Sequence, residues 1–275
     1  MKIPGEVTEY GIKHNTRVKH YPDGTAEVLC ASRQIFRVPG YERSNDWGEV
    51  SNKKDTSKAV TPEDEADNLA RAQRRARTAV RDMALCNPMS YFVTLTFDPA
   101  VIDRYDIKAI MRRVNGWLDN AVRRKGLAYI LIPELHKDGA VHFHGFFNDA
   151  LGVIDSGTMV PPGGGKPKRP RSAAQRAAWA EAGGREVFNL PSWPYGFSTA
   201  MKLHGDYRAA VGYVCKYIAK EQRKIGGRWY YHGGRLELPE VTYHDANIED
   251  IAAADGAATF ETDTLGGVTF AIWRG

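Results

Sequence analysis

The chain has 275 residues, of which 43% are hydrophobic and 11% aromatic, a composition typical of a globular protein rather than a disordered one. Its formal net charge of +5 permits a phosphate-rich partner but does not identify one. Three cysteines without a Cys-x-x-Cys pair argue against a disulfide framework or a thiolate zinc site, and no apolar run approaches the roughly 18 residues of a membrane span.

Residues 1–89 are predicted to form an N-terminal extension that contains one long helix, at about residues 61–86. Thr61 is a suitable cap, Pro62 suits the first helical position, and the acidic residues 63–65 favour the positive end of the helix dipole. Five arginines make the later part of this helix basic: Arg71, Arg74, Arg75, Arg77 and Arg81.

Residues 90–232 are predicted to form an α+β domain. The β-branched and aromatic residues of Tyr91–Phe97 predict a strand, and apolar side chains at helical spacing from Ile107 to Leu118 predict a helix. Strands at Ala128–Leu135 and Val141–Phe147 follow.

A helix capped by Asp206 and running to about Lys224, with a strand at Arg228–Tyr231, completes the order β-α-β-β-α-β. This is the order of a ferredoxin-like antiparallel sheet with helices packed on it.

A basic segment of about residues 152–192 interrupts this order. Residues 161–171 are so rich in Pro and Gly that we expect a flexible loop rather than an ordered element, followed by a short helix at Ala173–Ala182. A solvated linker and a DNA-contacting loop both remain open. The DNA-binding candidates in this loop are Lys166, Lys168, Arg169 and Arg171. Residues 233–275 are expected to form a C-terminal extension without a recognisable motif.

A candidate metal site lies on the two strands of the predicted hairpin. Because side chains alternate along a strand, His142 and His144 share one face, where two imidazoles can converge on one ion. Glu134 joins that face if the turn Lys137–Gly139 has three residues, whereas a two-residue turn would send it to the other face. We favour the three-residue turn, since a glycine that closes such a loop with a bulge is common.

Two imidazoles and one carboxylate leave coordination positions open, which suits catalysis better than structure. The predicted cofactor is one divalent metal ion, Mn²⁺ or Mg²⁺, the ions that phosphate chemistry commonly uses. His136 is an alternative ligand nearer the turn. A His-x-His pair also arises by chance, so two exposed strand histidines remain an alternative.

A second candidate feature is a helix that carries two tyrosines. At 100° per residue, Tyr213 and Tyr217 lie about 40° apart and on the far side from the apolar stripe, with Lys216 and Lys220 around them. The alternative is that both rings cover a packing surface and keep their hydroxyls in water. The apolar stripe consists of Val211, Val214, Cys215 and Ile218.

These two features together predict a phosphodiester-cleaving chemistry. A phenol with a pKa near 10 is a poor nucleophile at neutral pH, but a divalent ion on the phosphate and a nearby lysine favour attack by the phenolate. The products would be a 5′-phosphotyrosine, which permits religation without ATP, and a free 3′-hydroxyl. Which tyrosine attacks first stays open, with a slight preference for Tyr213.

Three motifs in this order resemble those of the HUH endonucleases, and within them the two-tyrosine rolling-circle replication initiators of small single-stranded DNA phages and related plasmids. Phe92–Phe97 resembles the first strand motif, His142–His144 the His-hydrophobe-His motif, and Tyr213–Lys220 the two-tyrosine motif. The resemblance covers about residues 90–232 and does not account for the long insert.

The resemblance implies that Glu134, His142 and His144 hold the ion and that Tyr213 and Tyr217 open the DNA strand. Lys216 and Lys220 are then catalytic candidates, and Thr94 and Thr96 of the first motif are DNA-binding candidates.

The implied function is a replication initiator in the cytoplasm of a bacterial host, which nicks single-stranded origin DNA at a specific site and religates the product strand. The expected partners are a single-stranded origin, in the form of a hairpin, and a host helicase and DNA polymerase. No Gly-x-x-x-x-Gly-Lys-Ser/Thr motif occurs, so we expect no nucleotide cofactor, and no membrane partner.

Other functions stay open at this stage. A transposase or a mobilisation relaxase would share the chemistry. A non-catalytic single-stranded DNA-binding module would stack bases on aromatic side chains such as Tyr91, Trp193, Tyr195 and Phe197. A zinc hydrolase unrelated to DNA is a third alternative.

Overall fold

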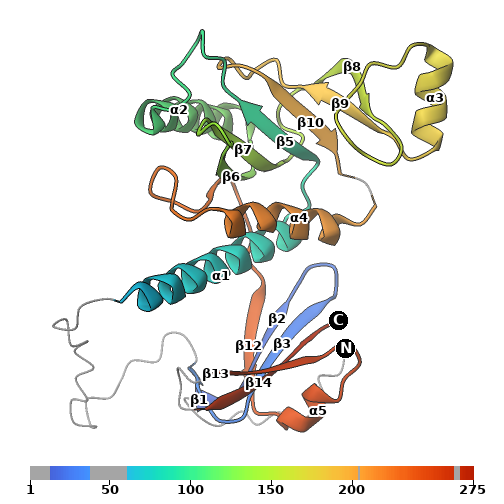
Figure 1. Cartoon of the computed structure of the whole chain (residues 1–275). Helices are drawn as coiled ribbons and strands as arrows, with labels where there is room; N and C mark the ends of the chain where they lie inside the picture. The colour runs from blue at the N-terminus through green and yellow to red at the C-terminus, as the bar shows by residue number, and fades with distance from the viewer. Residues whose placement is uncertain (1–12, 38–60, 204, 263–266) are drawn as a thin grey trace. The chain divides into compact units, whose positions relative to one another are not determined.

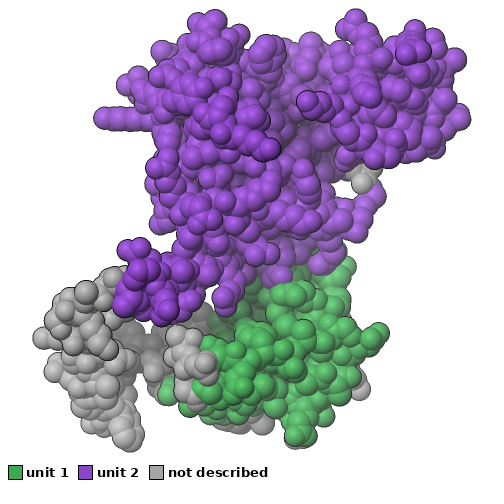
Figure 2. All heavy atoms as spheres, viewed as in Figure 1, with its two compact units in different colours: residues 1–59, 238–275 green, residues 60–237 purple. Residues whose placement is uncertain are grey.

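The computed structural model describes residues 13–37, 61–203, 205–262 and 267–275 (Figure 1). The chain divides into two compact units, one of residues 60–237 and one that combines residues 1–59 with residues 238–275 (Figure 2). This division differs from the expected boundaries after residues 89 and 232, because the long helix belongs to the central unit and the two ends of the chain share the other. The predicted α+β class is confirmed.

A seven-stranded antiparallel sheet is the framework of the central unit, with the strand order β11-β6-β7-β5-β10-β9-β8. Its strands β5, β7 and β6 have the 1-3-2 order of a split β-α-β unit, and the last strand, β11, joins beside β6. The bounds are β5 Tyr91–Thr96, β6 Tyr129–Leu135, β7 Val141–Phe147, β8 Ile154–Val160, β9 Arg185–Asn189, β10 Ser198–Lys202 and β11 Tyr231–Gly233.

In the described part of this unit the sheet is accompanied by the helices α1 Pro62–Cys86, α2 Ile107–Lys125, α3 Ala173–Glu181 and α4 Tyr207–Lys220. Thr61 and Asp64 form a capping box at the start of α1, and Asp206 caps α4 through the backbone N–H of Ala209. α4 ends at Lys220, four residues before the predicted end, because Glu221 turns to extended backbone and its carboxylate accepts a hydrogen bond from Leu135 N at 2.9 Å.

The main hydrophobic core lies on one face of this sheet, against α2. Val93 and Leu95 of β5 and Phe143 of β7 point into it, together with Ile110 and residues further along α2. Since side chains alternate, the intervening residues of β5 and β7 face the other side of the sheet, where α4 contacts β6 and β7 and α1 packs on α4 (Figure 1).

The insert is more ordered than the sequence suggested. β8 and β9 pair with each other and extend the sheet beyond β10. Met159 and Val187 are buried, and this burial stabilises strands that the surrounding Pro and Gly residues concealed. Within the Pro- and Gly-rich part, Lys168 forms a backbone bridge with Met159, so the expectation that this part contains no ordered element is wrong at this point. The short helix was predicted within a residue.

The second unit contains a five-stranded antiparallel sheet in the order β12-β2-β3-β14-β13, with α5 packed on it and its own small core. β1 and β4 form a separate pair. The bounds are β1 Lys13–His14, β2 Thr16–His20, β3 Ala26–Ala31, β4 Phe36–Arg37, β12 Glu240–His244, α5 Ile248–Ala252, β13 Ala258–Thr262 and β14 Val268–Arg274. Of the helices that the structure describes, none combines the length and apolarity needed to cross a lipid bilayer.

Candidate active site

The turn between β6 and β7 determines which side chains share a face. His136 N–H donates to the carbonyl of Ala140 at 2.8 Å, and Gly139 has a φ of 86°, which favours glycine. The turn therefore has three residues, and the register pairs Glu134 directly with His142. The predicted register is confirmed.

Two threonines of β5 lie beside the two imidazoles of β7. The register pairs Thr96 with His142 and Thr94 with His144. The threonine hydroxyls lie 3.3 Å from His142 Nδ1 and 3.1 Å from His144 Nδ1. These contacts orient the rings and direct each Nε2 away from the threonines, and on His144 this nitrogen lies 2.9 Å from Glu134 Oε2. That Thr94 and Thr96 bind DNA stays a prediction.

Charges and burial set the ionisation of this cluster. Burial of the Glu134 carboxyl opposes ionisation, but hydrogen bonds from His144 and from Lys220, at 3.3 Å, outweigh it and lower the pKa of Glu134. Burial also lowers the pKa of His142, and the His136 and His144 imidazoles lower it further. His142 is therefore neutral near pH 7, the form in which an imidazole binds a metal.

The two tyrosines of α4 lie against the imidazole pair. The ring of Tyr217 stacks on that of His144, with centroids 4.3 Å apart and planes 9° apart. The Tyr217 hydroxyl donates to the Tyr213 oxygen at 2.9 Å. Tyr217 is only 7% exposed whereas Tyr213 is 51% exposed, so the face opposite the apolar stripe covers the sheet instead of facing solvent throughout.

Lys220 connects the tyrosine helix to the carboxylate. Its ammonium nitrogen lies 4.7 Å from the centre of the Tyr217 ring and bonds to Glu134. Burial, together with the hydrogen bond to Tyr213, raises the pKa of Tyr217 well above its ordinary value. Lys216, the other predicted catalytic lysine, is exposed and makes none of the described contacts with this cluster.

The donor set fits a metal ion in type but not in its present arrangement. Glu134, His142 and His144 offer one carboxylate and two imidazoles from two neighbouring strands, and the threonines hold the Nδ1 side of both rings. Across the described parts of the chain, however, no three or more His, Cys, Asp or Glu side chains form a group that could hold a metal ion. The direct Glu134–His144 contact is the interaction that an ion would replace.

The basic loop lies away from this cluster. Lys166, Lys168, Arg169 and Arg171 are exposed and follow β8, the edge strand. β8 is four strand positions from β7, roughly 19 Å at the usual strand spacing. The structure therefore does not bring these cations to the imidazoles.

The aromatic residues considered for base stacking have different environments. Trp193 is 5% exposed and belongs to the core, whereas Phe197 is 70% exposed. Sequence reasoning overlooked Phe92, whose ring centre lies 6.3 Å from His144 and 6.1 Å from Tyr213. Its place two residues before Thr94 was the available signal, since alternate residues of a strand share a face.

Residues 90–222 match the model of a family described as replication-associated proteins of the ORF2 type, a family of rolling-circle replication initiators. The matched segment carries the carboxylate, both histidines and both tyrosines of the cluster, and it is the part of the chain that is similar to DNA replication proteins. No curated protein and no solved structure matches the chain.

Proposed function

We propose that the central unit is a DNA strand-nicking and strand-joining enzyme that uses a tyrosine as nucleophile and initiates rolling-circle replication of a small phage or plasmid. The observation that supports this most directly is the single cluster that contains both phenols and both imidazoles, with Tyr217 stacked on His144 at 4.3 Å. A phosphodiester placed against the imidazole pair would lie near a phenolic oxygen, as nucleophilic attack requires. The family match over residues 90–222 supports a role in replication.

Tyr213 is the better candidate for first attack. It is half exposed, and its oxygen accepts a hydrogen bond from Tyr217, which favours the phenolate. Attack on phosphorus forms the Tyr213–phosphate bond and breaks the bond to the 3′-oxygen, which takes up a proton and becomes a free 3′-hydroxyl. The reverse attack by a 3′-hydroxyl rejoins the strand.

Glu134, His142 and His144 are the residues that would hold one divalent ion, Mn²⁺ or Mg²⁺. Such an ion would supply positive charge for the non-bridging oxygens of the scissile phosphate. Thr94 and Thr96 orient the imidazoles, and Lys220 helps to keep the Glu134 carboxylate ionised. Replacing Thr94 by Val should weaken Mn²⁺ binding about 10- to 100-fold, measured by electron paramagnetic resonance of the free ion.

The decisive experiment uses 3′-labelled single-stranded oligonucleotides that tile the DNA molecule encoding this chain. After incubation with Mn²⁺, a denaturing gel should show a covalent protein–DNA adduct that a chelator prevents and that the Tyr213→Phe/Tyr217→Phe variant does not form. Binding without an adduct would indicate a binding module instead. Metal-dependent cleavage that persists in the double variant would indicate a hydrolase and contradict the proposal.

A further inference from the structure

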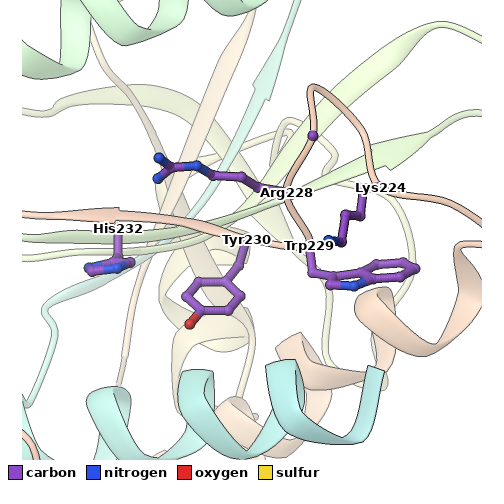
Figure 3. A pocket seen from close by; sticks show the side chains of 6 residues that line it. Lys224, Arg228, Trp229, Tyr230 and His232 are labelled. Atoms are coloured by element: carbon purple, nitrogen blue, oxygen red, sulfur yellow. The ribbon is translucent and has the colours of Figure 1, made fainter. Parts of the chain in front are cut away.

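A basic and aromatic hollow lies outside the tyrosine cluster, in the loop between α4 and β11 and at the start of β11. Its volume is about 230 Å³. Figure 3 shows its labelled side chains projecting from this loop and from β11. The lining residues are Lys224, Gly227, Arg228, Trp229, Tyr230 and His232.

The hollow borders the face of the sheet that carries the imidazoles. His232 pairs with Ile130 of β6, and directly paired residues point to the same face. Ile130 and Glu134 are four residues apart on β6 and therefore share that face. At the usual rise of a strand they are separated by roughly 13 Å, a distance that a short stretch of single strand spans.

The loop is held in place by β11. The Tyr231 hydroxyl lies 2.8 Å from the carbonyl oxygen of Ile225 and 2.9 Å from that of Gly226. Gly226 has a φ of 61°, and a side chain there would collide with the Tyr231 hydroxyl and with Met111. The hollow is thus formed before any ligand arrives.

The lining chemistry suits an anion with a flat ring attached. Lys224 and Arg228 are cationic, and neither Asp nor Glu is among the six lining residues. Tyr230 and His232 present rings 5.7 Å apart and tilted by only 31°. The indole N–H of Trp229 is buried and has no hydrogen-bond partner in the part of the chain that the structure describes, so it is a donor available to a ligand.

We propose that this hollow binds one nucleotide of the single strand that the tyrosines cut, with its phosphate on Lys224 and Arg228 and its base on the rings of Trp229 and Tyr230. The proposal rests on the proposed function, because that function supplies the strand. It assigns to the loop the anchoring of DNA next to the cleaved bond, a role separate from catalysis.

The test measures binding in a background that cannot cut. In the full chain carrying Tyr213→Phe/Tyr217→Phe, with chelator present, fluorescence anisotropy reports the affinity for a labelled twelve-residue oligothymidylate. Trp229→Ala should weaken binding about tenfold or more, as expected for loss of one base-stacking ring. Lys224→Ala/Arg228→Ala should reduce the slope of log affinity against log salt by about 0.7 per lost phosphate contact.

A matched control removes the same charge from the other face of the sheet. Lys108→Ala/Arg112→Ala lies on α2, and it should leave affinity and salt slope close to those of the parent. Equal affinities in the hollow variants and this control, with unchanged thermal unfolding, would overturn the proposal.

Free thymidine monophosphate provides a further arm. If it competes as tightly per molecule as the oligonucleotide binds, the hollow is a mononucleotide site and the strand-anchoring proposal is wrong. Because no step of this test requires cleavage, its result is independent of adduct formation: weakened binding in the hollow variants would support the hollow even if the chain formed no adduct.

Discussion

Tyr213 and Tyr217 each begin a Tyr-x-x-Lys sequence, yet their surroundings assign them different chemistry. Tyr217 is buried, stacked on His144 and a hydrogen-bond donor, whereas Tyr213 is exposed and an acceptor. A buried phenol with a raised pKa keeps its proton, and the exposed partner has the access that an incoming phosphodiester needs.

The first prediction follows from this difference. Tyr213→Phe should abolish the first covalent adduct, while Tyr217→Phe should slow its formation about 10- to 100-fold, because it removes one donor to the attacking oxygen. Rates of adduct formation on a denaturing gel distinguish the two. A Tyr217→Phe variant without adduct beside an active Tyr213→Phe variant would reverse the assignment.

A third tyrosine, Tyr207, has a structural role. Its hydroxyl donates to the carbonyl of Ala84 at 3.0 Å and lies 3.3 Å from that of Asn87, at the end of α1. Burial raises the pKa of Tyr207 to about 12. Since the fold favours the neutral phenol, this contribution to stability is complete below pH 10 and is lost as the pH rises from about 10 towards about 12.

Tyr207→Phe is therefore expected to lower the free energy of unfolding by about 1–2 kcal/mol near neutral pH, through loss of the hydrogen bonds. It should also flatten the decline of stability between about pH 10 and about pH 12. Urea unfolding at several pH values measures both effects. Tyr105→Phe, at an exposed ring, is the control, and an equally steep decline in the Tyr207 variant would contradict the linkage.

At the scale of elements, the hairpin β6–β7 was predictable and the helix packing was not. A glycine-closed three-residue turn fixes the register locally, and so Glu134 could be placed opposite His142 from the sequence. A helical wheel gives the angle of Tyr217 but not its neighbour. α4 lies between the sheet and α1, and only this packing shows that the tyrosine face is half buried.

Other elements lay beyond local signals. β8 and β9 were missed because their stability comes from pairing with the edge of a sheet that is distant in sequence, while Pro and Gly residues dominate the local pattern. The hollow at residues 224–232 was missed for the same reason, since it forms only where the loop meets β11.

Gly145 is the position where the hairpin tolerates least. A Cβ there would collide with the carbonyl oxygen of Ile130 and lie 2.9 Å from the Cα of Leu131, both backbone atoms of β6. Gly145→Ala should therefore destabilise the central unit by about 2–4 kcal/mol and displace the neighbouring His144.

The matched control is Gly116→Ala in α2, where an added methyl group meets nothing within 4 Å. This change should stabilise the protein by about 0.5–1 kcal/mol, because glycine is unfavourable within a helix. Chemical denaturation measures both variants. A Gly145→Ala protein as stable as the parent would show that β6 and β7 can separate without cost.

At the scale of the whole molecule, the boundaries of the two units could not be predicted from sequence. β2 pairs with β12, and β3 pairs with β14, across more than 200 residues of chain. No turn or periodicity signals such a pairing. The expected N- and C-terminal extensions are instead two parts of one sheet.

The division predicts which fragments fold. A fragment of residues 60–237 keeps the main core, all seven strands of its sheet and the two hydrogen bonds between Asn87 and Glu237, so it should fold and form the covalent adduct. A fragment of residues 90–232 lacks α1 and should unfold at a markedly lower temperature. Circular dichroism melting and the adduct assay test both fragments. A disordered 60–237 fragment would show that the units depend on each other.

The position of β14 has a consequence for synthesis on the ribosome. This last strand, Val268–Arg274, lies inside its sheet, between β3 and β13. The smaller unit therefore waits for the final residues to be translated, while the central unit has its full sequence some 30 residues earlier. A chain released prematurely would carry a finished tyrosine cluster beside an unclosed sheet, which marks it for removal by proteases before it encounters DNA.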